Sequence, residues 1–295
     1  MLLRVIAILF PMFSIVLAGY ICARRTKINM AVVNRLNLDY FTPALVFGAL
    51  VQMPLGTRQV DLIAASVTAV LLPGILMWGL CRLCHLDTRV WVPPHMFRNS
   101  GNLAIPIFVY TFGRAVMGDA VLMMVVATCL QMSIGILIIK GLDRRGLKQL
   151  FNVPVFYATF AALVINLSGI KIWPPLKQAA DLLGQSCIPL MLFTLGSQLI
   201  SLNRSGLKIG LLSTISSLGT GAISFFIIHQ FIKLPLQEQQ MMVLFTMLPP
   251  AVMNYLFAER YKLNSPAVAA MVLYGNFLAL FTMPVLLWYA LSILH

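Results

Sequence analysis

Charged residues are scarce in this chain. Only 10% of its 295 residues are charged, eight of them acidic, whereas 60% are hydrophobic. A soluble domain carries about a quarter charged residues. The shortage therefore excludes a water-exposed globular protein and predicts one that lies in lipid. No polar stretch is long enough to form a separate soluble domain.

Motifs of common enzyme classes are also missing. The chain has no phosphate-binding loop, no GxSxG and no HExxH, which argues against ATP-driven transport and intramembrane hydrolysis. The five cysteines are scattered, and the CxxC formed by Cys81 and Cys84 lacks further ligands at metal spacing. We therefore expect no enzyme, no cofactor and no metal site.

The net charge of +13 fits a membrane protein better than a nucleic-acid partner, because no basic run with interleaved aromatic residues occurs. Lys and Arg gather in alternate loops, as they do on the cytoplasmic side of membranes. The richer loops contain Arg24, Arg82, Arg144, Arg204 and Arg260. This asymmetry predicts that both termini face outward.

About 20 apolar residues cross a bilayer as a helix, and ten stretches qualify. They are 3–22, 32–53, 60–83, 91–113, 118–140, 150–170, 177–201, 206–232, 239–259 and 266–292. The first resembles a signal peptide, but it looks long enough to span and has a counterpart in the second half. The expected fold is an all-α membrane protein with ten transmembrane helices.

An internal repeat relates the two halves. Phe10-Pro11-Met12-Phe13 resembles Val153-Pro154-Val155-Phe156, Pro43 matches Pro189, and Pro106 matches Pro249, all at nearly constant offset. Each half has an odd number of spans, so the halves insert in opposite orientations. We predict two inverted five-helix repeats, 1–145 and 146–295, within one membrane domain.

Spans four and nine break near their middles, at residues 99–106 and 248–254. A helix cannot lose backbone hydrogen bonds in lipid, so such breaks must line a protein cavity. Half-helices beginning near Ala104 and Ala251 would then point bare N–H groups at an anion. The predicted helix-break residues are Pro106, Pro249 and Pro250. The predicted substrate-binding residues are Arg98, Asn99, Ser100, Gly101, Asn102, Asn254 and Tyr255.

Two charges within spans have alternative interpretations. Arg98 is either a counter-charge for an anion, or it pairs with Asp39 or snorkels to the membrane edge. Asp39 is either a proton-coupling group or part of an ion pair with Arg35 or Arg98. The cavity could also be lined by Tyr274, Asn276, Thr128 and Gln131.

Several motifs resemble the auxin efflux carrier family over nearly the whole chain. They are Val33-Asn34-Arg35 followed by Pro43, Asn99 before Ile105-Pro106, and Pro189 before Phe193-Thr194-Leu195-Gly196. The most specific is Leu248-Pro249-Pro250-Ala251-Val252, which continues into Phe257-Ala258-Glu259-Arg260-Tyr261. The short linker at 141–149 makes the chain similar to bacterial members of the family.

The resemblance implies a scaffold part and a transport part, with crossed broken helices 4 and 9 beside the substrate. It places Asn99 where plant carriers have a substrate-contacting Asn. At Asn254 the chain departs from the plant motif, which has Pro. It implies a bacterial inner-membrane transporter for a small carboxylate such as malonate or malate rather than auxin, and it allows a homodimer.

The sequence therefore predicts a secondary, alternating-access carrier of a small organic anion, with the lipid bilayer as its other partner. Two alternatives remain open. One is a sodium-coupled organic-anion symporter of the same fold, although neither break contains Asp or Glu. The other is a membrane sensor that binds a ligand without moving it.

Overall fold

The computed structural model describes residues 2–26, 29–140, 153–202 and 204–292. Helices make up 86% of it, and no strand is found among these residues. The elements of the first half are α1 (Leu2–Arg25), α2 (Met30–Leu36), the π-helix η1 (Asn37–Phe41), α3 (Thr42–Leu50), α4 (Thr57–Leu83), α5 (Thr88–Met96), the π-helix η2 (Ser100–Ala104), α6 (Ile105–Phe112), the 3-10 turn η3 (Arg114–Val116), α7 (Met117–Leu130), the π-helix η4 (Gln131–Gly135) and α8 (Ile136–Lys140).

The second half continues in the same way. Its elements are α10 (Pro154–Ser168), α11 (Pro174–Gln198), the 3-10 turns η6 (Leu199–Ser201) and η7 (Arg204–Gly206), α12 (Leu207–Phe231), α13 (Leu236–Thr246), α14 (Met253–Arg260) and α15 (Ser265–Ser292). The predicted boundary between residues 145 and 146, with its charged linker, lies outside the described residues.

Among the described residues, six helical segments are long and apolar enough to cross a membrane. They are Leu3–Arg25, Thr57–Leu83, Arg114–Lys140, Pro174–Ser201, Leu207–Phe231 and Ser265–Ser292. The remaining predicted spans fall on shorter or interrupted helices, such as α10 and the pair α13 and α14. The protein is therefore an all-helical, multi-pass membrane protein, while ten spans and the inverted repeat stay predictions.

Local sequence explains where several helices begin. The Asn29 side chain accepts a hydrogen bond from the N–H of Ala31 at 3.1 Å and caps α2. Asp87 does the same for α5 through the N–H of Arg89 at 2.9 Å. These caps satisfy donors that have no partner in the first helical turn.

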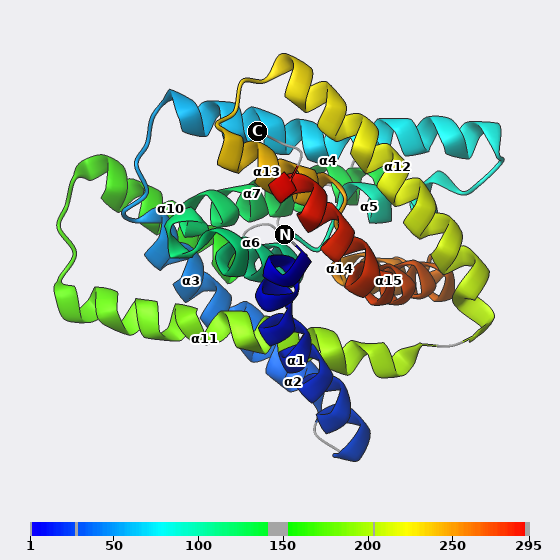
Figure 1. The fold of residues 1–295 in the computed structure, drawn as a ribbon, viewed down its shortest axis with the longest axis horizontal. Helices are drawn as coiled ribbons and strands as arrows, with labels where there is room; N and C mark the ends of the chain where they lie inside the picture. Colours follow the sequence, from blue (N-terminus) through cyan, green and yellow to red (C-terminus); the bar gives the residue numbers. More distant parts are fainter. Residues whose placement is uncertain (1, 27–28, 141–152, 203, 293–295) are drawn as a thin grey trace.

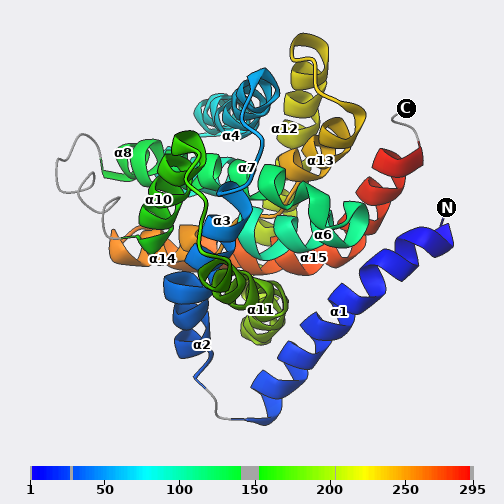
Figure 2. The same ribbon diagram turned by 90° about the vertical axis from the view of Figure 1, so that its left-hand side faces the viewer.

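The helices pack as two groups. The α11 group consists of α1, α2, α3, α10 and α11, and the crossover group consists of α4 to α8 and α12 to α15. Figure 1 shows α4 and α11 crossing opposite sides of the molecule, and Figure 2 shows α1, α2 and α11 below α4, α12 and α13. Each group is held mainly by contacts among its own helices.

Glycine brings two helix backbones together within the α11 group. A Cβ atom at Gly196 of α11 would overlap the backbone oxygen of Val16 on α1, and one at Gly19 of α1 would overlap that of Phe193. Membrane helices associate closely through such small residues because lipid supplies no hydrophobic drive between them.

A cavity of about 960 Å³ lies between the two groups. Its walls come from α3 and α11 on one side and from α6 and the beginnings of α4 and α7 on the other; they include Gly48, Gln52, Arg58, Tyr110, Arg114, Asp119, Lys177, Asp181, Gln185 and Ile188. Two ionic contacts line it, because Lys177 donates to Asp181 at 2.6 Å and Arg58 to Asp119 at 2.8 Å.

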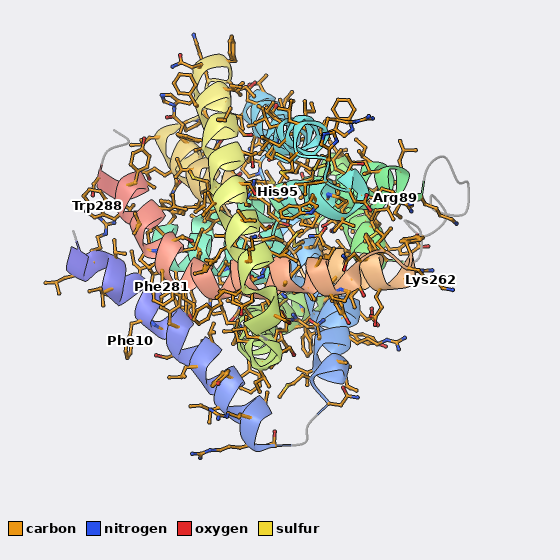
Figure 3. The ribbon with its side chains drawn as sticks, turned by 90° about the vertical axis from the view of Figure 1, so that its right-hand side faces the viewer. Phe10, Arg89, His95, Lys262, Phe281 and Trp288 are labelled. Carbon is orange, nitrogen blue, oxygen red and sulfur yellow. The ribbon has the colours of Figure 1, made fainter. Side chains whose placement is uncertain are left out.

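The two groups also meet along an apolar groove between α1 and α15. It has a volume of about 500 Å³ and is lined by side chains that include Phe10, Phe13 and Trp288. Figure 3 shows Phe10 and Trp288 at one side of the molecule and Arg89 and Lys262 at the other.

Candidate functional site

Both predicted breaks exist, but the first lies further upstream than expected. Helix α5 ends at Met96, and η2 begins at Ser100 and runs directly into α6. Pro106 lies in the first turn of α6, where a missing N–H costs little. The prediction that the chain unwinds between Gly101 and Pro106, with Pro106 as a helix-break residue, is therefore wrong. The second break separates α13, which ends at Thr246, from α14, which begins at Met253.

The two breaks cross and hydrogen-bond to each other. The N–H of Asn99 donates to the carbonyl of Pro249 at 2.8 Å, and the N–H of Ala251 donates to the carbonyl of Phe97 at 3.0 Å. These bonds form an isolated antiparallel bridge between Arg98 and Pro250. The predicted meeting of the two breaks is thus confirmed, and part of the backbone freed by one break is satisfied by the other.

Three buried asparagines tie this crossover together. Asn254 donates to the carbonyl of Phe97 at 2.7 Å, and Asn99 donates to Oδ1 of Asn276 at 2.8 Å. Asn276, on α15, donates in turn to the carbonyl of Pro250 at 3.0 Å. The Nδ2 groups of Asn99 and Asn254 therefore already donate hydrogen bonds to other parts of the protein.

Four half-buried backbone N–H groups at the crossover lie in the first turns of helices, where no intrahelical partner exists, and they make no backbone hydrogen bond outside the helices among the described residues. They belong to Gly101 and Asn102 in the first turn of η2 and to Val252 and Met253 at the start of α14. The side chains of Ser100 and Asn102 also make no recorded hydrogen bond. Gly101 and Asn102 are half-buried, as are Val252 and Met253.

Arg98 lies on the opposite side of the crossover, where α5 and α13 end. Only 4% of its surface is exposed. Its guanidinium donates to Oγ of Ser217 on α12 at 2.6 Å and to the carbonyl of Leu248 at 2.8 Å. Arg98 does not pair with Asp39, and its buried side chain does not reach the membrane edge. Both of these predictions are therefore wrong.

The position of Arg98 changes the electrostatics of the crossover. Helix C-termini carry partial negative charge and N-termini partial positive charge. The C-termini of α5 and α13 and the N-termini of η2 and α14 all meet here. The arginine offsets the C-terminal charges, and no acidic side chain neutralises it among its recorded partners. The remaining field favours an anion.

The other polar residues predicted for the site are less close to this centre. Asp39 forms an ion pair with Arg35 at 3.3 Å, on a half-exposed part of η1, and it does not line the large cavity. Tyr255 lies half-buried in the first turn of α14. Gln131 begins the π-helix η4 and is buried, with its Nε2 unpaired.

Two methionines lie next to Gly101 at the crossover. A Cβ atom at Gly101 would lie 3.5 Å from the sulfur of Met124 on α7 and 3.9 Å from Cε of Met191 on α11. Met191 follows Ile188, which lines the cavity, by one helical turn. The unbranched side chain of Met adapts readily to different neighbours, so these side chains can rearrange without a change of backbone.

Sequence reasoning missed two sets of polar contacts. One joins His95 on α5, fully buried, to Oγ of Ser216 on α12 at 2.8 Å, and Figure 3 shows His95 in the interior. The other joins Arg58 on α4 to Asp119 on α7 and Glu238 on α13. The signal for the second set was available, because only eight acidic residues occur in this apolar chain.

Two comparisons with known proteins complement the geometry. A family model described as "Membrane transport protein" matches residues 142–287, a range that contains the second break but not the first. No curated protein matches the chain.

Proposed function

We propose that this chain, which carries the auxin efflux carrier family domain at residues 142–287, is a secondary transporter of a small organic anion. The family domain makes it a membrane transport protein, and the substrate class and mechanism are our inference. The observation that carries this inference is the crossover, where two helix starts meet and four half-buried N–H groups make no hydrogen bond outside the helices among the described residues.

The chemistry of the crossover suits a carboxylate. Peptide N–H groups at helix N-termini bind anions through hydrogen bonds and through the helix dipole. Gly101 and Asn102 supply donors from one half-helix, and Val252 and Met253 supply them from the other. A carboxylate bound between them would accept from both. An uncharged amide of the same shape would gain less, because hydrogen bonds to ions are stronger.

The large cavity supplies an access route. At about 960 Å³ it exceeds the need of a small carboxylate, and it lies between two helix groups that share few contacts. We infer that the anion passes through the cavity, past Met124 and Met191, and reaches the N–H groups at the crossover. Movement of the crossover group against the α11 group would then close this route and open another.

Gly101→Ala tests the site with little risk to the fold. An added Cβ would make only ordinary contacts, with Met124 and Met191, and alanine favours helix over glycine by about 0.8–1 kcal/mol. The methyl group would nevertheless stand beside the bare N–H groups. We expect unchanged or higher thermal stability, but weaker carboxylate binding by roughly tenfold, the loss of about one charge-assisted hydrogen bond.

The measurement is ligand-dependent thermal shift, followed by flux into proteoliposomes, over a panel of mono- and dicarboxylates and their amides. Gly219→Ala is the matched control, because a Cβ atom there meets nothing within 4 Å and lies on α12 outside the crossover. Equal affinity for carboxylates and amides, or normal carboxylate flux in Gly101→Ala, would contradict the proposal. Binding without flux would favour a sensor over a transporter.

A further inference from the structure

Three charged side chains from three helices meet at the wall of the large cavity. Nη2 of Arg58, in the first turn of α4, donates to Oδ2 of Asp119 on α7 at 2.8 Å. Nε of the same guanidinium donates to Oε1 of Glu238 on α13. We call these three residues the Arg58 cluster. All three helices belong to the crossover group.

The cluster contains two carboxylates and one cation. Glu238 is 0% exposed, and its second oxygen, Oε2, is buried without a hydrogen-bond partner. An unpaired carboxylate oxygen in such a place is costly, and two carboxylates that share a site disfavour simultaneous ionisation. A proton on one carboxyl group removes the excess charge and gives the buried oxygen a hydrogen to donate or share.

No second cation compensates the cluster from the helices packed around it, as far as the structure describes them. Asp61, exposed on α4, adds negative charge on the same side, and His229 in the last turn of α12 stacks on Phe225 instead. The other cations of these helices, Arg82 and Lys208, occupy the opposite ends of α4 and α12. Arg114, which lines the same cavity, and Lys233, on the loop before α13, form no ion pair with Asp119 or Glu238 among the described residues. Helix α15 carries no charged residue.

The cluster has access to water on one side only. Arg58 and Asp119 both line the cavity, and their side chains are 49% and 11% exposed, whereas that of Glu238 is 0% exposed. A proton can therefore pass from a hydronium ion in the cavity to Asp119, which shares Arg58 with Glu238. The donor is left as water, and no other bond is broken.

We propose that the Arg58 cluster is the proton-binding site that couples proton movement to anion transport. This inference rests on the proposed function. When the two helix groups close the cavity, the cluster loses its water. Burying a cluster with a net negative charge in an apolar contact costs free energy, whereas a protonated, neutral cluster avoids that cost. Closure of the cavity then requires a protonated cluster, and the cluster exchanges its proton with water only while the cavity is open.

The proton can be observed directly, without any transport assay. Infrared spectra of the purified protein in an ester-free detergent report the C=O stretch of a protonated carboxylic acid, which shifts in heavy water. Exposed carboxyl groups remain ionised at pH 6. We expect the wild-type protein to show this band at pH 6 and to lose it as the pH rises.

The variants separate a proton site from a structural ion pair. Glu238→Gln and Asp119→Asn each leave one carboxylate for Arg58, so each should lose the band. Arg58→Gln leaves two carboxylates without a cation, so the band should grow. Asp61→Asn, the control, should keep it. A wild-type protein with no such band, or a band unchanged in Glu238→Gln, would overturn the proposal, and thermal unfolding shows which variants are folded.

Proteoliposomes then test the coupling. An inward proton gradient should stimulate carboxylate uptake by wild-type and Asp61→Asn proteins but not by Glu238→Gln, which should retain exchange of labelled for unlabelled anion. Stimulation by a sodium gradient and not by a proton gradient would also overturn the proposal. A pH-dependent band in a protein that moves no carboxylate would instead count against the proposed transport function.

Discussion

Replacement of Asn276 by alanine removes the side chain that joins α15 to both breaks. Asn276 accepts from Asn99 at 2.8 Å and donates to the carbonyl of Pro250 at 3.0 Å. Its third bond, to Val272 at 2.8 Å, stays within α15. The substitution therefore leaves one donor and one acceptor of the crossover unpaired, and only 4% of Asn276 is exposed to any replacement partner.

We expect Asn276→Ala to lower the free energy of unfolding by a moderate amount. Leaving a buried polar group unpaired costs about 1–3 kcal/mol. Interhelical hydrogen bonds in membrane proteins average about 0.6 kcal/mol, because the unfolded chain in the membrane also finds partners. Two such losses predict destabilisation of about 1–3 kcal/mol. Because the lost bonds hold the two helix N-termini in register, carboxylate binding should weaken as well.

Asn166→Ala is the matched control. Asn166, on α10, donates to the carbonyls of Leu50 and Met53 at 2.7 and 2.8 Å, but it lies in the α11 group, away from the crossover. Both variants should lose similar stability in unfolding titrations with a denaturing detergent. Only Asn276→Ala should lose carboxylate-induced thermal stabilisation. If Asn166→Ala weakens binding equally, or if Asn276→Ala binds normally, the crossover is not the site.

Three further predictions follow from other contacts. Arg98→Met should lower both stability and carboxylate affinity, and Arg98→Lys should not restore them in thermal-shift titrations, because an ammonium ion cannot make the forked contacts of a guanidinium. Gly196→Ala should separate α1 from α11 and lower the unfolding temperature, whereas Gly219→Ala should leave it unchanged or raise it. A membrane-impermeant maleimide applied to intact cells should label an introduced Lys171→Cys but not exposed Cys84; labelling of Cys84 would reverse the predicted orientation.

The sequence predicted an all-helical chain and the position of the second break because apolar length and proline carry local physical information. It misplaced the first break because Pro106 is tolerated in a first helical turn, and the actual interruption at Phe97–Asn99 follows two prolines that sit inside α5. A proline shows that a backbone donor is missing. It does not show whether the local geometry needed that donor.

Contacts between distant segments were beyond reach of the sequence. Arg98 was expected to be a counter-charge for a substrate, to pair with Asp39 or to snorkel, and the sequence did not reveal that it donates to Ser217, 119 positions away. The Arg58 cluster spans up to 180 positions. Such pairs depend on how whole helices pack, and a single sequence records only that each member is an unusual polar residue in an apolar span.

The crossover is held by bonds whose donors and acceptors all lie in one helix group. Asn99, Asn254 and Asn276 connect the breaks to each other and to α15, and Arg98 connects them to α12. None of these bonds has to break when that group shifts against α11. The binding geometry should then be the same whether the site opens to one face of the membrane or to the other. Half-saturating substrate concentrations should therefore match in right-side-out and inside-out vesicles. The direction of net flux should follow the gradients alone.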